Sequence, residues 1–199
     1  MGKRYGMVIN LKRCVGCHTC TVACKAEHGI KDGSWIKVLT VGGNSMDTPA
    51  GVYPDLSMYY LPKLCMHCEK ARCIDTCPNG ALCRREDGIV VVDIQQCDGC
   101  RLCIDACPYD AIFYDEEQES IGKCTFCFER VDQGMEPFCV TCCGMRAMFF
   151  GDLNDPESQV SRLIQENGAY PLQSGSEMGL SVFYFPNVGK LQFSQQSPG

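Results

Sequence analysis

The stretch that decides the fold reads Cys97-Asp98-Gly99-Cys100-Arg101-Leu102-Cys103-Ile104-Asp105-Ala106-Cys107-Pro108. Its spacing, C-x2-C-x2-C-x3-C-P, places three cysteines on one short arc and a fourth about one helical turn later. In bacterial iron–sulfur proteins with this spacing, the fourth thiolate binds a different cluster from the first three. The stretch therefore predicts a second, paired set of cysteines in the same chain.

The chain supplies three further sets of four cysteines. The first set is C-x2-C-x2-C-x3-C at residues 14–24, and the second is C-x2-C-x4-C-x3-C-P at 65–78. The fourth set is C-x2-C, then eleven residues, then C-x3-C, at 124–143. Residues 72–82 and 102–112 are identical at six of eleven positions, at an offset of thirty residues. This internal repeat indicates that one structural unit occurs several times.

The cysteine content and the N-terminal sequence bear on the compartment. There are 18 cysteines in 199 residues, a density typical of either disulfide frameworks or metal ligation. Residues 1–10 show neither the apolar segment nor the cleavage site of a secretory signal, and no eighteen apolar residues run together. We therefore expect free thiols in the cytoplasm and no direct membrane span. The alternative is a periplasmic location, reached by co-export with a signal-bearing partner.

Zinc is the main chemical alternative to iron. Structural zinc sites join two C-x2-C pairs around one ion, which leaves the third and fourth cysteines of the first and third sets unexplained. We therefore expect iron. The formal net charge of −6 would become about −14 with four clusters of about −2 each. That charge disfavours a nucleic-acid partner.

Exchange of the fourth cysteine between paired sets predicts four [4Fe-4S] clusters with sixteen cysteines as iron ligands. The predicted ligands are Cys14, Cys17, Cys20 and Cys143 for cluster 1; Cys24, Cys124, Cys127 and Cys139 for cluster 2; Cys65, Cys68, Cys73 and Cys107 for cluster 3; and Cys77, Cys97, Cys100 and Cys103 for cluster 4. Each iron then has a cysteine ligand, so no catalytic residue is expected. Cys83 is left over and is expected to be a small buried residue. Cys142 also remains, and it competes with Cys143, which Gly144 follows in place of proline.

The expected fold class is α+β, with two two-cluster ferredoxin-like modules built from strand, ligand loop and short helix, and with surface insertions. The expected divisions are an outer module at 1–24 plus 115–150, an insertion of weak structure at 25–64, a central module at 65–114, and a partner-binding C-terminal extension at 151–199. Strands are expected at 5–11, 88–94, 111–114, 147–150 and 182–185. A short helix with proline in its first turn is expected from Asp155-Pro156-Glu157 onward.

Ten basic or imidazole side chains lie close to the cysteines in the sequence. The cations are interpreted as ordinary solvated surface that offsets the cluster charge: Lys12, Arg13, Lys63, Arg72, Arg101, Lys123 and Arg146. The histidines are His18, His28 and His67, and two of them lie inside ligand loops. There they are expected to tune a cluster or simply to pack.

The motifs over residues 5–150, with residues 151–160, resemble the four-cluster iron–sulfur subunit of the dimethyl-sulfoxide-reductase superfamily of molybdenum and tungsten enzymes. The resemblance implies a non-catalytic electron-transfer subunit in a heterodimer or larger complex. Its large catalytic partner would hold molybdenum or tungsten on two pterins, and a further electron donor or acceptor would complete the chain of carriers. The resemblance also implies that cluster 1 lies nearest the catalytic partner and cluster 4 at the far end.

The alternative function is a free polyferredoxin that serves several redox partners. The insertion at 25–64 and the extension at 151–199 favour the subunit, because a free carrier needs neither. The resemblance leaves the substrate open, since relatives serve sulfoxides, sulfur compounds, arsenate, nitrate, formate and phenolic compounds.

Overall fold

The computed structural model describes residues 2–43, 45–172 and 177–186. It is a mixed α/β fold with one three-stranded sheet and several two-stranded ladders in this part of the chain. The elements in chain order are β1 (Tyr5–Asn10), α1 (Thr19–His28), β2 (Lys37–Val41), β3 (Ala50–Val52), β4 (Asp55–Ser57), β5 (Tyr59–Lys63), α2 (Arg72–Thr76), β6 (Leu82–Arg84), β7 (Val90–Val92), α3 (Leu102–Ala106), β8 (Ile112–Asp115), β9 (Ser120–Lys123), α4 (Phe128–Val131), α5 (Phe138–Thr141), β10 (Met148–Asp152), α6 (Gln159–Asn167) and β11 (Val182–Phe185).

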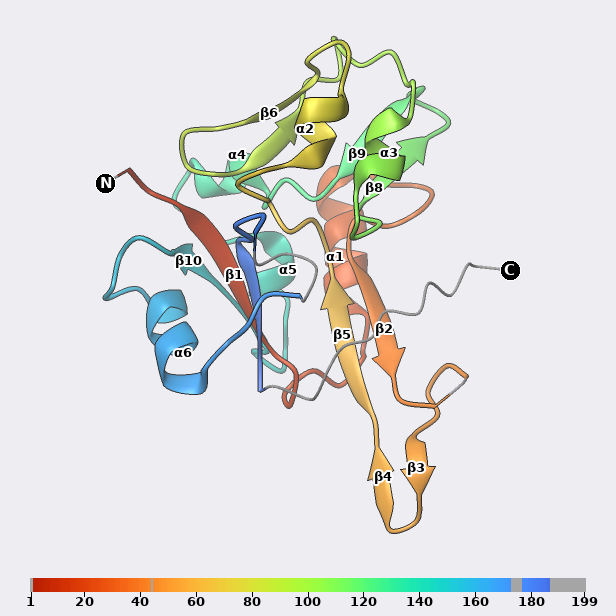
Figure 1. Cartoon of the computed structure of the whole chain (residues 1–199), viewed down its shortest axis with the longest axis vertical. Helices are drawn as coiled ribbons and strands as arrows, with labels where there is room; N and C mark the ends of the chain where they lie inside the picture. The colour runs from red at the N-terminus through yellow and green to blue at the C-terminus, as the bar shows by residue number, and fades with distance from the viewer. Residues whose placement is uncertain (1, 44, 173–176, 187–199) are drawn as a thin grey trace.

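The three-stranded sheet has the order β10-β1-β11 and ties the two ends of the chain together (Figure 1). β1 pairs antiparallel with β10 and parallel with β11. The apolar run Met7-Val8-Ile9 in β1 is almost completely buried, which is what a central strand with both faces covered requires. The strand expected at 182–185 is thus present with the same bounds, and the strands expected at 5–11 and 147–150 are present with small differences at their ends.

The helix expected after residue 155 is present as α6, but its start differs from the prediction. Ser158 is the N-cap, and its hydroxyl accepts a hydrogen bond from the Ser161 N–H. Pro156 therefore lies before the helix and not in its first turn. Val160 of α6 is fully buried with Val8 against the sheet. β11 also joins the chain's own sheet, so residues 182–185 are part of the fold's interior. Residues 187–199, the end of the expected arm, lie outside the described residues.

The expectation of weak structure at 25–64 is wrong. β2 and β5 form a five-residue antiparallel ladder, and Ile36 and Leu61 are buried in the main core. α1 itself runs into this segment and ends at Gly29, whose left-handed φ of 63° suits a glycine at a helix C-terminus. Beyond the ladder, the β3–β4 hairpin extends away from the body of the molecule, with exposed Val52 and Tyr53 (Figure 1).

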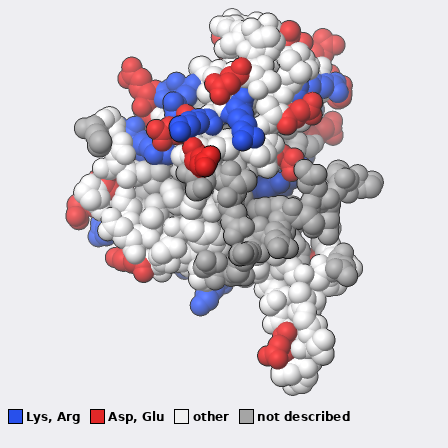
Figure 2. Space-filling model, viewed as in Figure 1, with Lys and Arg blue, Asp and Glu red and all other residues white. Residues whose placement is uncertain are grey.

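The central segment forms the opposite end of the molecule from the hairpin (Figure 1). α2 and α3 are both five residues long, contact each other, and are each followed by a short strand. The strand predicted at 88–94 is shorter in the structure, where β7 covers only Val90–Val92. Ile94 lies past the end of β7 and is 55% exposed. Charged side chains of both signs gather over this end of the molecule in Figure 2.

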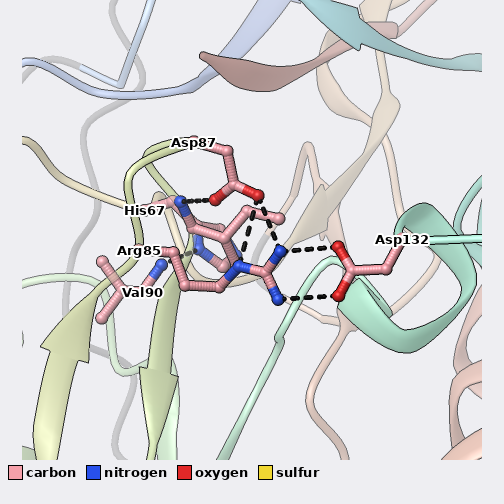
Figure 3. A network of polar contacts seen from close by, with 6 residues as sticks. His67, Arg85, Asp87, Val90 and Asp132 are labelled. Carbon is pink, nitrogen blue, oxygen red and sulfur yellow. Dashed lines mark hydrogen bonds and ion pairs between the residues drawn. The ribbon is translucent and has the colours of Figure 1, made fainter. Parts of the chain in front are cut away.

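An ion-pair network joins the central segment to the segment after α4 (Figure 3). Arg85 follows β6 and makes a two-pronged contact with Asp132, at 2.6 Å and 3.0 Å. Arg85 also binds Asp87 and lies over the Phe128 ring, 5.0 Å from its centroid. The guanidinium holds the pKa of Asp132 below its usual range through this hydrogen bond. The network fixes how the two segments lie against each other.

Candidate cluster-binding sites

The first set of thiols joins the loop before α1 to the turn after α5. The pKa of Cys20 is raised to about 11, mainly by burial, and the electrostatic effects of Cys14, Cys143 and Cys17 contribute to the rise. Burial is also the main cause of the raised pKa of Cys14, with Cys143 and Cys17 adding to it. α1 and α5 contact each other, so the two parts of this set are held by packed helices. The structure thus brings Cys143 to the three cysteines of residues 14–20.

The second set gathers Cys24 of α1, the two cysteines after β9, and Cys139 of α5. Burial raises the pKa of Cys24 to about 12, and Cys127 contributes to the rise. The pKa of Cys139 is raised well above its usual value by burial and by Cys124, Cys127 and Cys24. The fourth cysteine of the first motif therefore lies with the fourth motif.

The third set surrounds a cavity. The cavity is lined mainly by apolar side chains and by Cys65, Cys68, Cys73 and Cys107. Burial raises the pKa of Cys68 to about 12, and the other three thiols add to the rise. The fourth cysteine of the residue 97–108 motif thus faces the motif that starts at residue 65.

The fourth set places Cys77 beside the three cysteines of the residue 97–108 motif. Burial raises the pKa of Cys103 to about 11, and Cys77, Cys100 and Cys97 add to the rise. Cys100 is exposed and Cys97 is half-buried, so this set lies near the surface.

Thiols of neighbouring sets also affect one another's pKa values electrostatically, and these effects indicate which sets are neighbours in the fold. Cys20 of the first set acts on Cys24 of the second. Cys65 of the third set acts on Cys124 of the second. Cys103 of the fourth set acts on Cys73 of the third. These interactions join the sets in the sequence first, second, third and fourth.

The donor chemistry of these sites fits iron–sulfur clusters. Buried thiols with raised pKa values stay neutral on their own, whereas bound iron would deprotonate them. Backbone N–H groups point at sulfur, such as Ala147 N–H to Cys143 Sγ at 3.3 Å. Among the described residues, three buried polar atoms in or near the ligand loops have no hydrogen-bond partner: His67 Nε2, Ser120 Oγ and Thr125 Oγ1. Orphaned donors of this kind suit the sulfides and thiolates of a cluster.

A single metal ion requires a tighter arrangement of ligands. In the part of the chain that the structure describes, no three His, Cys, Asp or Glu side chains converge as ligands of one ion. Sulfurs about 2.3 Å from one zinc ion lie roughly 3.8 Å apart. The four thiolates of a [4Fe-4S] site surround a whole cube of iron and sulfide.

Two sequence expectations about single residues are wrong, and both concern burial. Cys83 is exposed on β6, not buried. Lys123 is only 1% exposed at the end of β9, so it does not belong to the solvated surface. The alternation of side chains along a strand does not predict either outcome, because the burial of a side chain depends on which neighbouring segments cover that face of the strand. The burial of the Ser120 hydroxyl, at the start of β9, was not predicted for the same reason, and the burial of the Thr125 hydroxyl, in the loop after β9, has no signal in the sequence.

His28 and His67 lie beside the thiol sets. His28 Nε2 is 3.3 Å from Cys127 Sγ, and its ring packs at a tilt against Trp35, with 4.6 Å between the ring centroids. Burial lowers the pKa of His28, so the ring is neutral and can donate one hydrogen bond. His67 is buried, whereas His18 is exposed. His28 therefore has the placement that tuning of a cluster through a hydrogen bond to thiolate sulfur requires.

Replacing Gly99 with alanine is expected to weaken the fourth site. Gly99 has a φ of +69°, and an added Cβ would lie 2.6 Å from the Glu119 carbonyl oxygen. The left-handed conformation alone costs a residue with a Cβ about 1–2 kcal/mol. We expect the G99A variant to retain less iron on heating than the native chain, measured by iron content after gel filtration.

Gly144→Ala is the matched control for Gly99→Ala. Gly144, like Gly99, is next to a predicted ligand in the sequence, but an added Cβ there meets nothing within 4 Å and φ is not left-handed. Equal iron retention in the two variants would show that the Gly99 backbone conformation does not matter to the site.

No helix in residues 2–43, 45–172 or 177–186 combines the length and apolar character needed to cross a bilayer.

Comparisons with known proteins identify the family. Residues 56–153 match the model of a 4Fe-4S dicluster domain. The B polypeptide of polysulfide reductase from Wolinella succinogenes is 39% identical over 94% of this chain and 96% of its own length. The arsenate respiratory reductase iron–sulfur subunit of a Shewanella species is 32% identical over 94% and 97%. The B polypeptide of anaerobic dimethyl sulfoxide reductase from Escherichia coli is 40% identical over 78% and 77%. This chain belongs to the family of iron–sulfur electron-transfer subunits of dimethyl-sulfoxide-reductase-type oxidoreductases.

Proposed function

We propose that this chain relays electrons through four [4Fe-4S] clusters to or from a catalytic subunit that holds molybdenum or tungsten on two pterins. The observation that carries the proposal is the convergence of cysteines from distant motifs into four sets, each joined to the next. Relatives that match over nearly their whole length are named as components of reductases, which supports a subunit role over a free polyferredoxin.

The proposed ligands follow the crossed pairing. Cluster 1 takes Cys14, Cys17, Cys20 and Cys143; cluster 2 takes Cys24, Cys124, Cys127 and Cys139; cluster 3 takes Cys65, Cys68, Cys73 and Cys107; cluster 4 takes Cys77, Cys97, Cys100 and Cys103. The mutual electrostatic effects of the thiols within each set support this assignment. A cluster with four cysteine ligands leaves no iron open to a reactant, so the chain carries electrons and performs no chemistry on a substrate.

The proposed organisation has two ferredoxin-like modules. The outer module spans 1–24 and 115–150 and holds clusters 1 and 2, while the central module spans 65–114 and holds clusters 3 and 4. The electrostatic effects between thiols of neighbouring sets support the order 1, 2, 3, 4 for electron transfer along the chain of clusters. Clusters bound to adjacent thiols lie close together, which is what a chain of electron carriers needs.

The chain's own groups would hold and tune the clusters. Backbone N–H groups and His28 supply hydrogen bonds to thiolate sulfur, and such bonds are among the factors that set a cluster's potential. Burial of Cys24, Cys124 and Cys139 keeps water away from the second site. Bound clusters would supply one-electron redox chemistry.

The two segments outside the modules are proposed to serve the complex. The insertion at 25–64 presents Val52, Tyr53 and Leu56 on the projecting β3–β4 hairpin, and the extension at 151–199 completes the sheet with β11. We propose contact with the catalytic subunit for both segments. A cytoplasmic complex is the preferred location, with co-export by a signal-bearing catalytic subunit as the alternative.

Co-purification under anaerobic conditions tests the function. The tagged chain, expressed in its native host, is expected to bring down a large protein that contains molybdenum or tungsten and pterin, detected by metal analysis and pterin fluorescence. Recovery of an iron-loaded 22.0 kDa chain alone would favour the free polyferredoxin.

A further inference from the structure

Lys123 is a buried cation at the end of β9. The residue is 1% exposed, although lysine is almost never fully buried unless its charge is compensated. Its ammonium group donates hydrogen bonds to the carbonyl oxygens of Val90 and Cys124, the latter at 2.9 Å. Both acceptors are uncharged. Burying an ammonium group that has only neutral partners costs free energy of desolvation, so its burial here indicates that negative charge lies nearby.

The surrounding thiols identify where that negative charge would be. Burial and Cys65 raise the pKa of Cys73 to about 12, while Lys123 acts in the opposite direction. Lys123 also opposes the strong effect of burial on Cys124. Cys73 belongs to the third set and Cys124 to the second. Val90, whose carbonyl accepts a hydrogen bond from Lys123, lines the cavity of the third set, and Cys124, the other acceptor, belongs to the second set. The ammonium group therefore lies between the two sets at which the outer and central modules meet.

The neighbouring imidazole does not contribute a charge. His67 Nδ1 accepts a hydrogen bond from the Val90 N–H at 3.0 Å, so the proton of the neutral ring is on Nε2. The ring stacks on Phe126 with 3.8 Å between centroids and is fully enclosed. Val90 thus binds His67 through its N–H and Lys123 through its carbonyl. Among the described residues, Lys123 is the only buried lysine or arginine, while Arg72, which also lines the cavity of the third set, is exposed.

We propose that Lys123 is a positioning residue that raises the reduction potentials of clusters 2 and 3 and so stabilises an electron at the junction between the modules. The inference rests on the proposed function. An all-cysteine cluster carries about −2 when oxidised and gains one further negative charge when one electron enters. The fixed ammonium stabilises the more negative, reduced form at both clusters. Burial makes the effect large, because solvent does not screen it.

Two variants separate the charge from the hydrogen bonds. Lys123→Gln keeps an N–H donor for the Val90 and Cys124 carbonyls but removes the charge, and Lys123→Met removes both. Lys70→Met is the matched control, because Lys70 is also close in sequence to a ligand of the third set but is exposed. The measurement is an EPR-monitored redox titration of the anaerobically purified complex, with iron content determined on the same samples.

We expect K123Q to lower the one-electron reduction equilibrium constants of clusters 2 and 3 about tenfold or more, a shift of about 59 mV per tenfold toward lower potential. Clusters 1 and 4 should change less, and K70M should change none by more than about twofold, since exposed charges are screened. K123M is expected to shift in the same direction. Unchanged potentials in K123Q at full iron content would overturn the inference.

Iron content distinguishes failure of this inference from failure of the proposed function. Four clusters in the native complex with unchanged K123Q potentials would refute only the role of Lys123. Fewer clusters in the native complex would refute the function itself. If both neutral variants lose iron, Lys123→Arg becomes the deciding variant, because it keeps the positive charge. Clusters retained in K123R with native potentials would support the role of the charge. Loss of clusters from K123R as well would make Lys123 a packing residue and would refute the inference.

Discussion

Replacing Cys107 with serine is expected to abolish cluster 3 and to leave cluster 4 in place, although Cys107 belongs to the motif that surrounds cluster 4. The cavity lined by Cys65, Cys68 and Cys73 is closed by Cys107, whose thiol raises the pKa of Cys68. Loss of one of four thiolates should release or alter this cluster, with about four fewer irons per chain if it is lost completely.

Comparison of EPR spectra among single variants measures this effect. C107S and C68S should lose the same signal, because both residues are proposed to serve one cluster, and C103S should lose a different one. C83S is the control, since Cys83 is exposed on β6 and is assigned to no cluster. A spectrum of C107S that matches C103S instead would refute the crossed pairing.

Cys143→Ser is expected to abolish cluster 1, whereas Cys142→Ser leaves all clusters intact. Cys143 acts electrostatically on Cys14 and Cys20, and its sulfur accepts a hydrogen bond from the Ala147 N–H. If cluster 1 is the one nearest the catalytic subunit, its loss should interrupt electron flow almost completely.

The readouts for this pair are the EPR spectrum and the electron-transfer rate to the catalytic subunit. C143S should lose the same EPR signal as C17S, and the rate should fall by orders of magnitude. C142S should retain both the signal and the rate of the native complex. A loss of cluster 1 in C142S with retention in C143S would reverse the ligand assignment.

The [4Fe-4S] cofactor type could be predicted from the sequence because ligand spacing is local, whereas the assignment of ligands to clusters stays a prediction. Steps of C-x2-C and C-x3-C place thiols on one loop or one helical turn, and the fold must then supply the partner for each fourth cysteine. The structure places Cys24, Cys77, Cys107 and Cys143 beside the motifs that crossed pairing assigns to them.

The rest of the fold depended on contacts between distant segments, which sequence periodicity does not report. β2 and β5 pair across seventeen intervening residues, 42–58, and the turn-rich composition of that segment concealed the ladder. β11 joins β1 from the other end of the chain. The burial of Lys123 and the exposure of Cys83 likewise depend on which loops cover β9 and β6.

Iron and acid-labile sulfide per chain, measured on anaerobically purified protein, test the central claim most directly. Four [4Fe-4S] clusters predict about sixteen irons and about sixteen sulfides per polypeptide, with little zinc. A chain that holds stoichiometric zinc, or far less iron than this with all sixteen thiols intact, would contradict the account.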